Sequence, residues 1–446
     1  MMRLLLPLLC SAMLATAHSE LNLVAHGPVG NNACVDSPLR LTFNEPPVLA
    51  HHGRIEVRRE SDGATVDTVD LAATKYTDRF GDSENSTALS YEPVCIDGNT
   101  AFVRLRTQCL RPNESYEVRI PPGAFQDAEG HDFTGFNTGW TFRTKATPSS
   151  KADRLIVAAD GTGDFCTVQG AVDQMKPGLT HVPVIFIRKG NYHELVRIDR
   201  ERKHVHLIGE DRQGTIISYT NNEKLNSGWI QRAVLGCEAD DFMLENLTVQ
   251  NTTPYRGSQA EAVCINAQRC VLRNANFLSF QDTLNLSGRV YVADSYIEGD
   301  VDYVWGYGTA SFERCELRSM HDGYIVQARN SAARPGYLFV HCRLTAAPGV
   351  QKCWLARIDT GRFPASHVAF VHCAMGPHIL PEGWQIIGPP ADTLRFEEGG
   401  STDSSGHPLE VSGRNPAAKA LAPKVESSLS AESILSGQDG WHPQQK

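Results

Sequence analysis

The chain has 446 residues, a mass of 49.0 kDa and a hydrophobic fraction of 41%. This length suits one large domain plus a small one, or two to three average ones, and it can bury a sizeable core. Lysine and arginine total 42 against 51 aspartate and glutamate residues, which gives a formal net charge of −9 without any basic block. The charge balance argues against nucleic-acid or anionic-membrane partners, and the ordinary apolar fraction argues against a disordered chain.

Residues 1–17 have the pattern of a secretory signal peptide. Arg3 supplies the positive start, residues 4–14 form an apolar run, and Ala-Thr-Ala at 15–17 provides a cleavage site. The apolar run is too short to cross a membrane, and no later stretch reaches the roughly 18 consecutive apolar residues of a spanning helix. A lipoprotein anchored through Cys10 is the alternative, but no small residue directly precedes that cysteine. We therefore expect a secreted, extracellular protein with no membrane partner.

The number of cysteines bears on disulfide pairing, because an exported protein meets an oxidising environment. Cys10 leaves with the signal peptide, so eleven of the twelve cysteines remain. In an oxidising environment we expect some of them to pair, and an odd total leaves at least one free. None has the clustered spacing of a zinc site, so no metal is expected. The alternative for several of them is a role as small buried apolar residues.

Residues 18–145 read as a small domain of short strands. Apolar and polar residues alternate with period two in several phrases, which Gly, Pro, Asp and Asn residues separate. Short strands at this spacing, with almost no helical pattern, indicate an antiparallel β-sandwich of about 120 residues. Together these phrases resemble the bacterial Ig-like modules found in front of secreted enzymes, so a spacer is the default role. Residues 146–152 follow as a polar linker that contains Ser and Pro.

Residues 153–446 are predicted to form a solenoid. One helical pattern at 167–175 suits an amphipathic cap over its open end. Six β-rich phrases then recur, with starts 29, 19, 20, 27 and 30 residues apart: 242–249, 271–277, 290–296, 310–317, 337–344 and 367–375. Such repetition without intervening helices indicates a parallel β-helix, while a propeller, the main rival, would need a blade signature. The predicted fold class is all-β: a right-handed parallel β-helix preceded by a small antiparallel β-sandwich.

Two aspartates of the solenoid are candidates for chemistry. Asp282 stands in the phrase QDTL and Asp302 in DVDYVWG, 20 residues or about one coil apart. Stacking of the coils would place them side by side. Two neighbouring carboxylates can divide acid, base and nucleophile roles, because proximity separates their pKa values. Taken alone, however, aspartates at coil ends more often cap turns.

At these residues the chain resembles the pectin methylesterase (pectinesterase) family. The resemblance consists of several blocks in the family's order and covers about residues 153–443. The blocks are GTGDFCTVQGAVDQM (161–175), VPVIFIRKGNYHELVRI (182–198), HLIGEDRQGTIIS (206–218), NLTVQNT (246–252), SQAEAV (258–263), FQDTL (280–284), GDVDYVWG (299–306), MGPHILPEGW (375–384) and DGWHP (439–443). Any one block alone would be weak, whereas the ordered set indicates homology.

The resemblance implies roles for five residues. Asp302 would be the nucleophile that attacks the C6 carbonyl of a methyl galacturonate. Asp282 would protonate the departing methanol and then activate water against the acyl-enzyme. The amides of Gln281 and Gln259, 22 residues apart, would stabilise the oxyanion, and Arg357 would hold the nucleophile ionised. This set is chemically coherent, because a carboxylate nucleophile needs a partner acid and amide donors suit a tetrahedral oxyanion.

Three aromatic residues are candidates for substrate binding. Trp384, in PEGW, is the first choice, followed by Tyr303 and Trp305, although aromatic residues in a solenoid more often fill the core. The family's usual Leu-Gly-Arg-Pro-Trp block is Leu-Ala-Arg-Ile-Asp here (355–359), so Asp359 replaces a tryptophan. That replacement puts substrate specificity in question more than reaction type.

The sequence therefore predicts a secreted carboxylic-ester hydrolase, a pectinesterase, that demethylates methyl-esterified galacturonan without a cofactor. The expected partner is pectin or polygalacturonan, with no nucleic acid, and the expected state is a monomer. One alternative is an esterase or thioesterase with another substrate, although secretion argues against acyl-CoA. A second is a pectin-binding relative with weak or lost catalysis. Pectate lyases and polygalacturonases share the β-helix, but the ordered blocks are those of the esterases.

Overall fold

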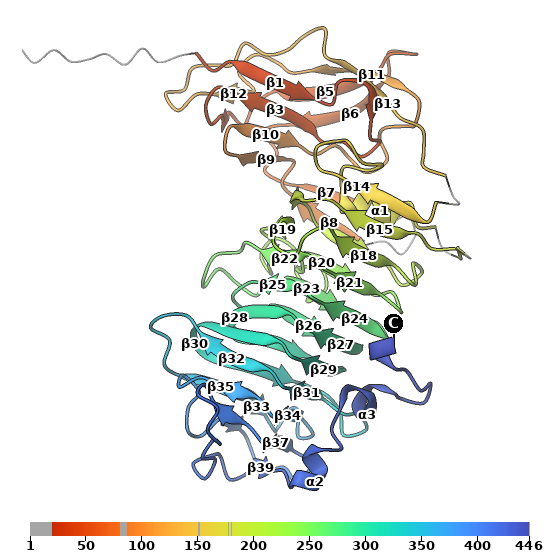
Figure 1. Cartoon of the computed structure of the whole chain (residues 1–446). Coiled ribbons are helices and arrows are strands. Elements are labelled where there is room, and N and C mark those ends of the chain that lie inside the picture. Colours follow the sequence, from red (N-terminus) through yellow and green to blue (C-terminus); the bar gives the residue numbers. More distant parts are fainter. Residues whose placement is uncertain (1–19, 81–86, 150–151, 177, 180, 446) are drawn as a thin grey trace, which may run out of the picture.

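Figure 1 shows the computed structural model of the protein, which describes residues 20–80, 87–149, 152–176, 178–179 and 181–445. The predicted signal peptide at 1–17 and part of the predicted linker at 146–152 lie outside the described residues. Mostly antiparallel sheets occupy the chain up to Thr144, and parallel strands begin at Arg154. The parallel strands extend as one column away from the N-terminal sheets (Figure 1).

Two sheets make up most of the N-terminal region, with strand orders β1-β3-β10-β9 and β2-β13-β11-β5-β6. Their pairs are antiparallel except β2 with β13, and two short antiparallel pairs, β4 with β12 and β7 with β8, complete the region. The strands are β1 (Leu23–Gly27), β2 (Gly30–Ala33), β3 (Leu39–Phe43), β4 (Val48–Leu49), β5 (Arg54–Arg59), β6 (Thr65–Asp70), β7 (Tyr76–Phe80), β8 (Thr87–Tyr91), β9 (Val94–Asp97), β10 (Thr100–Val103), β11 (Ser115–Arg119), β12 (Phe125–Gln126) and β13 (Thr141–Thr144).

The alternating pattern of these strands produces a common core between the two sheets. Ile55 and Val57 of β5 and Tyr116 and Val118 of β11 are all fully buried, with less buried polar residues between them. Strand side chains point alternately to opposite faces, so this period-two pattern buries one face of the sheet. Residues from both sheets share one hydrophobic cluster, which is the arrangement expected of a sandwich.

The rest of the chain is a parallel β-helix. One face is an 11-stranded sheet: β14 (Arg154–Val157), β15 (Val184–Ile187), β18 (His206–Gly209), β21 (Met243–Glu245), β24 (Cys270–Arg273), β27 (Arg289–Ala293), β29 (Thr309–Glu313), β31 (Tyr337–Val340), β34 (His367–Val371), β37 (Arg395–Gly399) and β39 (Lys419–Ala420). A 15-stranded sheet forms the other faces: β16 (Gly190–His193), β17 (Val196–Ile198), β19 (Thr215–Tyr219), β20 (Leu235–Cys237), β22 (Thr248–Asn251), β23 (Val263–Ile265), β25 (Asn276–Leu278), β26 (Leu284–Leu286), β28 (Tyr296–Gly306), β30 (Glu316–Ala328), β32 (Arg343–Ala346), β33 (Cys353–Asp359), β35 (Ala374–Met375), β36 (Trp384–Ile387) and β38 (Thr402–Asp403).

The register of the strands confirms the predicted parallel β-helix. Val290 pairs with Ala310 of the next coil, and Ala310 pairs with Tyr337, at separations that match the predicted repeat. Equivalent side chains stack inside the column: the ring of Phe339 lies 4.4 Å from that of Phe312 and 4.5 Å from that of Phe370. Each coil therefore buries its apolar residues against the coils above and below it.

Helices cover the start and the side of the column. The predicted cap at 167–175 is present as α1 (Val168–Asp173), and Thr167 caps it by accepting a hydrogen bond from the Gly170 N–H. Near the C-terminus lie α2 (Pro423–Glu426), α3 (Ala431–Leu435) and the 3₁₀ turn η1 (Pro443–Gln445). Buried residues of α3 and Trp441 pack on the outer face of the 11-stranded sheet, so the chain end runs back beside β27 and β29 (Figure 1).

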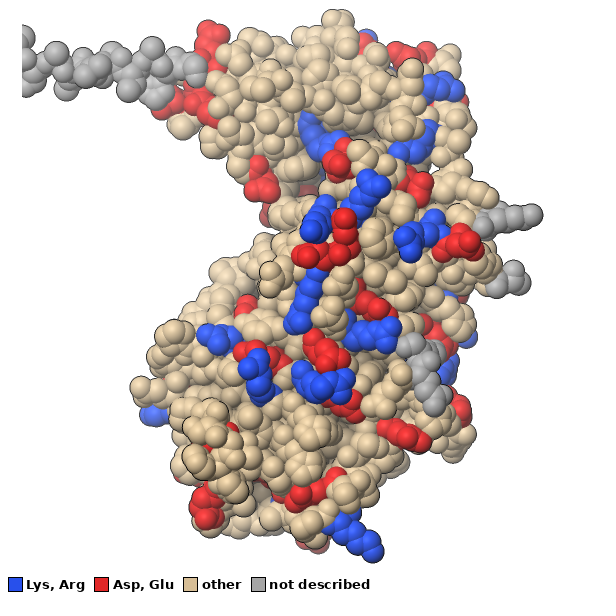
Figure 2. All heavy atoms as spheres, viewed as in Figure 1, with Lys and Arg blue, Asp and Glu red and all other residues tan. Residues whose placement is uncertain are grey.

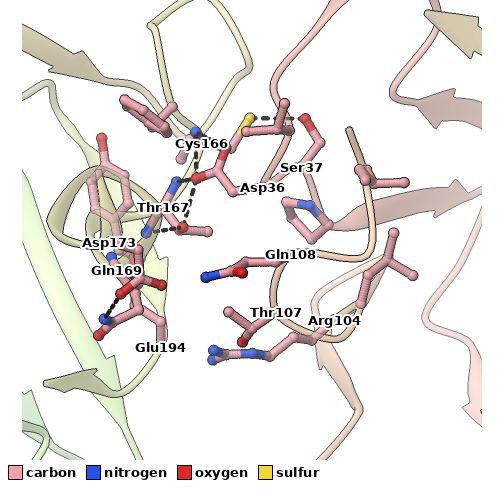
Figure 3. A pocket seen from close by; sticks show the side chains of 18 of the residues that line it. Asp36, Ser37, Arg104, Thr107, Gln108, Cys166, Thr167, Gln169, Asp173 and Glu194 are labelled. Atoms are coloured by element: carbon pink, nitrogen blue, oxygen red, sulfur yellow. Dashed lines mark hydrogen bonds between the residues drawn. The ribbon is translucent and has the colours of Figure 1, made fainter. Parts of the chain in front are cut away.

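The N-terminal region contacts the first coil through a polar junction, which Figure 3 shows. The Asp36 carboxylate accepts hydrogen bonds from the N–H groups of Cys166 and Thr167 and from the Thr167 hydroxyl, at 2.6–3.1 Å. On the other side, Glu194 accepts from the N–H groups of Val168 and Gln169 at 2.7 and 2.9 Å. Asp36 therefore binds the two N–H groups that directly precede α1, and Glu194 binds the first two N–H groups of the helix, while Thr167 caps the third. A cavity of about 330 Å³ lies beside them.

The cysteines differ from expectation. The eleven cysteines that follow Cys10 are all described, and all are free thiols in the structure. The prediction that some of them pair is therefore wrong for this structure. Nine are buried, and in the β-helix Cys342 and Cys373 each direct the thiol to backbone carbonyls, including Phe312 and Phe339 of the preceding coil. They serve as small core residues, which was the alternative reading.

On the face in Figure 2, Lys and Arg residues alternate with Asp and Glu residues and no single-sign patch appears. Among the described residues, no helix has the length and apolar character that crossing a membrane would need.

Candidate active site

Asp282 and Asp302 lie on neighbouring coils, as their 20-residue separation predicts. The register pairs Leu284 of β26 with Val304 of β28, each two residues beyond one of the aspartates, and the Asp282 N–H donates to the Val301 carbonyl at 3.0 Å. Both aspartates are nearly buried and have positive φ angles, 69° for Asp282 and 50° for Asp302. Non-glycine residues in this region carry a backbone cost of order 1–3 kcal/mol, and such residues cluster at functional sites.

Arg357 of β33 holds Asp302 in a two-point ion pair. Its Nε and Nη2 donate to the two carboxylate oxygens of Asp302 at 2.8 and 2.5 Å. The guanidinium also lies 4.4 Å from the ring centre of Tyr324, so it is fixed from two sides. Burial raises the pKa of Asp302, and Arg357 opposes that shift. The fork geometry fixes the carboxylate in one orientation.

Asp282 has an arginine of its own. Arg232, from the segment before β20, donates from Nη2 to Asp282 at 3.0 Å, and its Nε and Nη2 donate to the two oxygens of Glu261 at 2.7 and 2.8 Å. The remaining nitrogen, Nη1, donates to Glu223 at 2.7 Å. Burial raises the pKa of Asp282 well above its usual value; Glu261 and Asp302 add to this, while Arg232 opposes it. A raised pKa is what a carboxyl group needs to act as an acid near neutral pH.

The two predicted amides lie next to this pair of aspartates. Gln281 directly precedes Asp282, and its carbonyl accepts from the N–H of Ala260, which follows Gln259, at 3.1 Å. Both glutamines are half-buried, and the Gln259 side-chain oxygen accepts from the Ser258 hydroxyl at 3.1 Å. The five predicted catalytic residues therefore lie on nearby coils of the 15-stranded sheet: Gln259 before β23, Gln281 and Asp282 before β26, Asp302 within β28 and Arg357 within β33.

The predicted substrate-binding aromatic residues are less well placed. Tyr303 is 0% and Trp384 is 1% exposed. Tyr303 directs its hydroxyl to Ser319, and Trp384 stacks on Phe396 at 4.8 Å. Neither ring is accessible for stacking on a sugar in this structure. The prediction that Tyr303 and Trp384 bind substrate is therefore corrected: both are core residues. The reason is that both side chains point into the column, where they are part of its hydrophobic core.

Trp305 remains next to the candidate site. It is 4% exposed, and its ring lies 4.7 Å from the Arg329 guanidinium carbon and 5.8 Å from that of Arg232. Sequence reasoning missed an aromatic group that is more open to solvent. The ring of Tyr255, a residue 40% exposed, stacks on His321 at 3.6 Å and lies 5.7 Å from the Phe280 ring. Phe280 directly precedes Gln281.

Sequence reasoning also missed Arg232 and Glu261. Glu261 carried a signal, since it interrupts the apolar run Ala-Glu-Ala-Val at 260–263 and is fully buried. Arg232 carried none, because it stands 50 residues before Asp282 in a segment without strand periodicity. Only the stacking of coils brings these residues together.

One group among the described residues could hold a metal ion. Ligand atoms of Cys34, Asp36 and Cys166 lie within 4.8 Å of one another at the junction. The Asp36 oxygens, however, already accept the hydrogen bonds of α1, and the Lys145 ammonium donates to the Gly161 carbonyl at 3.5 Å, close to the Cys34 thiol. This donor set suits a structural contact better than a cation site.

Known proteins resemble the second part of the chain. The family profile described as pectinesterase matches residues 154–406. Pectinesterase 31 of Arabidopsis thaliana is 35% identical over 245 residues, which cover 52% of this chain and 76% of that protein. Pectinesterase 2 of Olea europaea is 30% identical over 265 residues, which cover 56% of this chain and 71% of that protein.

Solved structures show the same fold. A pectin methylesterase from carrot aligns with a TM-score of 0.58 and 23% identity, covering 66% of this chain and 96% of that one. A pectin methylesterase in complex with a hexasaccharide aligns with a TM-score of 0.55 and 21% identity, covering 66% of this chain and 99% of that one. At this identity the structures support the β-helix, and the family rests on the sequence matches. Because the profile covers more than half of its length, the chain belongs to the pectinesterase family.

Proposed function

We propose that this protein is a secreted pectinesterase that hydrolyses the methyl esters of galacturonan and releases methanol, with Asp302 as nucleophile. The observation that carries the proposal is the pair of nearly buried aspartates on adjacent coils, each bound to its own arginine. Two relatives by sequence are pectinesterases, and one structural neighbour is a pectin methylesterase with a bound hexasaccharide.

In the first half of the reaction, an Asp302 oxygen attacks the C6 carbonyl carbon of a methyl galacturonate. The carbonyl oxygen becomes an oxyanion, which the side-chain amides of Gln281 and Gln259 stabilise; one donor of this kind is worth about 2.7–4 kcal/mol. Asp282 gives its proton to the methoxy oxygen, and methanol leaves. The product is an acyl-enzyme on Asp302 and an Asp282 carboxylate.

In the second half, the Asp282 carboxylate takes a proton from water, and the water oxygen bonds to C6. The Asp302 carboxylate leaves and returns to Arg357, and the free galacturonate departs. The pH dependence follows from this sequence. Asp302 must be ionised and Asp282 protonated at the start, so the rate rises as Asp302 loses its proton and falls as Asp282 loses its own.

Secretion, the N-terminal module and the oligomeric state belong to the same proposal. The pattern of residues 1–17 supports export, and pectin is an extracellular polymer. The sandwich region at 18–145 would act as a spacer or accessory module before the catalytic domain at 153–446. We expect a monomer without a nucleic-acid partner, and the mixed surface charge in Figure 2 supports that expectation.

The test is methanol release from highly methylated pectin by the mature protein and by Asp302→Ala. The matched control is Asp392→Ala, which removes an exposed aspartate of the same β-helix. We expect release by the wild type and the control, and a loss of at least about 10³-fold in Asp302→Ala. Release that persists in Asp302→Ala would overturn the nucleophile assignment. Cleavage of small esters without cleavage of pectin would instead identify a different substrate, for which the Asp359 replacement is the leading cause.

A further inference from the structure

The Arg232 guanidinium is the hub of a buried charge cluster beside Asp282. Its side chain is 10% exposed, and four donor contacts of 2.7–3.0 Å join it to Glu261, Asp282 and Glu223. Glu261 is 0% exposed, whereas the Glu223 side chain is 37% exposed. Arginine is suited to this position because its planar fork presents five N–H donors in fixed directions.

The cluster links three successive coils. Arg232 precedes β20, Glu261 precedes β23 and Asp282 precedes β26, and these three strands are hydrogen-bonded neighbours in the 15-stranded sheet. Arg232 thus reaches across the Glu261 coil to the Asp282 coil. A bridge of this length restrains the Asp282 side chain from a coil that carries none of the proposed catalytic residues.

The charges of the cluster do not balance when every group is ionised. The buried carboxyl groups are Asp282, Asp302 and Glu261, and the guanidiniums that contact them are Arg232 and Arg357. Glu223, which binds Arg232, and Arg329, which acts on both aspartates, add one charge of each sign. Four negative charges therefore face three positive ones, which leaves an excess of one negative charge in a site largely removed from water. Binding one proton removes the excess, and Asp282 and Glu261, which share Arg232, are the two groups between which that proton is divided.

We propose that Arg232 and Glu261 are positioning residues that hold Asp282 in place and keep it protonated until methanol leaves. This inference rests on the proposed function. Arg232 alone would favour the Asp282 carboxylate and remove the acid. Glu261 binds the same guanidinium through two hydrogen bonds and offsets its charge, so Asp282 keeps both a fixed geometry and its proton.

The same pair assists the proton transfer. When Asp282 gives its proton to the methoxy oxygen, the new carboxylate already faces the Arg232 Nη2 at 3.0 Å. No side chain needs to move to stabilise the negative charge, which is the condition for efficient electrostatic stabilisation. The other charged groups that act on Asp282 include Asp302, which favours the protonated form, and Arg329 and Arg357, which oppose it.

The test measures kcat and KM for methanol release against pH in Glu261→Gln, Arg232→Gln and Arg232→Lys. Loss of the Glu261 charge should move the alkaline limb of kcat to lower pH by about one unit or more. Loss of the Arg232 charge should move it to higher pH and lower kcat about 10- to 100-fold through misplacement of Asp282. Arg232→Lys keeps the charge without the fork, so its limb should stay near that of the wild type while kcat falls.

Opposite shifts of one limb are a readout that a purely structural role cannot produce. The matched control is Glu398→Gln, which alters another buried bidentate pair of the β-helix, with Arg414, at 2.9 and 3.1 Å. It should leave the limb in place whatever it does to stability. The inference would be overturned if the alkaline limb of the kcat–pH profile stays at the wild-type pH in both Glu261→Gln and Arg232→Gln while circular dichroism shows that both variants are folded.

A second measurement covers variants that fold poorly. Infrared difference spectra should show a protonated carboxyl band in the wild type at neutral pH that Asp282→Asn lacks and that titrates at lower pH in Glu261→Gln. A band that is unchanged by Asp282→Asn would also overturn the inference. Failure of the underlying function is distinguishable, because it would appear as a wild-type protein that releases no methanol from pectin, and failure of the nucleophile assignment as methanol release that Asp302→Ala does not abolish.

Discussion

The candidate site and the junction with the N-terminal region both remove carboxylates from water, yet they satisfy them differently. At the site, Asp302 and Asp282 are bound by guanidiniums from other coils. At the junction, Asp36 is bound by the N–H groups of Cys166 and Thr167 just before α1, and Glu194 by the first two N–H groups of the helix. Burial raises the pKa of all four.

This difference in binding partners suits the carboxylates of the site to catalysis and those of the junction to holding the two regions together. A side-chain ion pair can keep its geometry while the carboxylate gains or loses a proton or a bond, because the guanidinium carries full charge and stays in place. A backbone cap cannot do so, since the N–H groups belong to the helix and any change in the carboxylate affects the helix start. We therefore expect changes at the site to affect the rate and changes at the junction to affect stability.

The largest effect should come from Arg357→Gln. This change leaves the Asp302 carboxylate nearly buried without its ion-pair partner and without its two-point orientation; Arg329 remains as a more distant cation. We expect kcat to fall by about 10³-fold or more, the scale of a lost electrostatic contact in a water-poor site, and the folded protein to persist. Steady-state methanol release at saturating pectin measures it.

Arg362→Gln is the matched control, because Arg362 is exposed and lies five residues further along the same coil. It should retain near wild-type activity. An Arg357→Gln enzyme with unchanged kcat would show that the guanidinium is only a structural partner of Asp302. The expectation that changes at the site affect the rate would then be wrong.

Some of these positions could be predicted from the sequence and others could not, depending on whether a motif or a coil spacing fixes them. Asp282, Asp302 and Arg357 stand in recognisable blocks, and the 20-residue spacing of the two aspartates corresponds to one coil, so their meeting was predictable. The burial of Tyr303 and Trp384 was not, because an aromatic residue near a cleft can face inward or outward with the same neighbours in sequence. The contacts of Asp36 were also unpredictable, because its partners lie 130 residues away at the start of α1. The sequence predicts that helix but does not show which residues pack against it.

The next effect in size should come from Asp36→Asn at the junction. The amide has one neutral acceptor oxygen and an NH2 in place of the second oxygen, so the N–H groups of Cys166 and Thr167, which directly precede α1, lose the charged acceptor and compete for what remains. Each unsatisfied buried donor costs about 1–3 kcal/mol, and we expect a loss of about 3 kcal/mol in the free energy of unfolding with kcat unchanged. Urea unfolding followed by tryptophan fluorescence measures the first quantity, and methanol release measures the second.

Asp62→Asn serves as the control, because Asp62 is an exposed turn residue of the N-terminal region. A large drop in kcat for Asp36→Asn at temperatures where the protein is fully folded would mean that the junction communicates with the site. The separation of assembly from chemistry would then be wrong.

The smallest effect should be a pH dependence of stability that originates at Glu194. Burial raises the pKa of Glu194 from its usual value of 4.5 to about 7, so between these values the folded state holds a proton that the unfolded state has released. The stabilisation is complete below about pH 4.5 and is lost as the pH rises through about 7. For such a shift the loss of unfolding free energy between pH 5 and pH 7 is about 2 kcal/mol, at 1.36 kcal/mol per pKa unit.

The variant Glu194→Gln cannot titrate at this position. Its unfolding free energy should therefore fall by about 2 kcal/mol less than that of the wild type over this range, while Glu60→Gln, an exposed control, should follow the wild type. Parallel pH profiles for Glu194→Gln and the wild type would show that the α1 N–H groups hold Glu194 ionised throughout, and Glu194 would then resemble Asp302, the ionised carboxylate of the site, rather than the protonated Asp282.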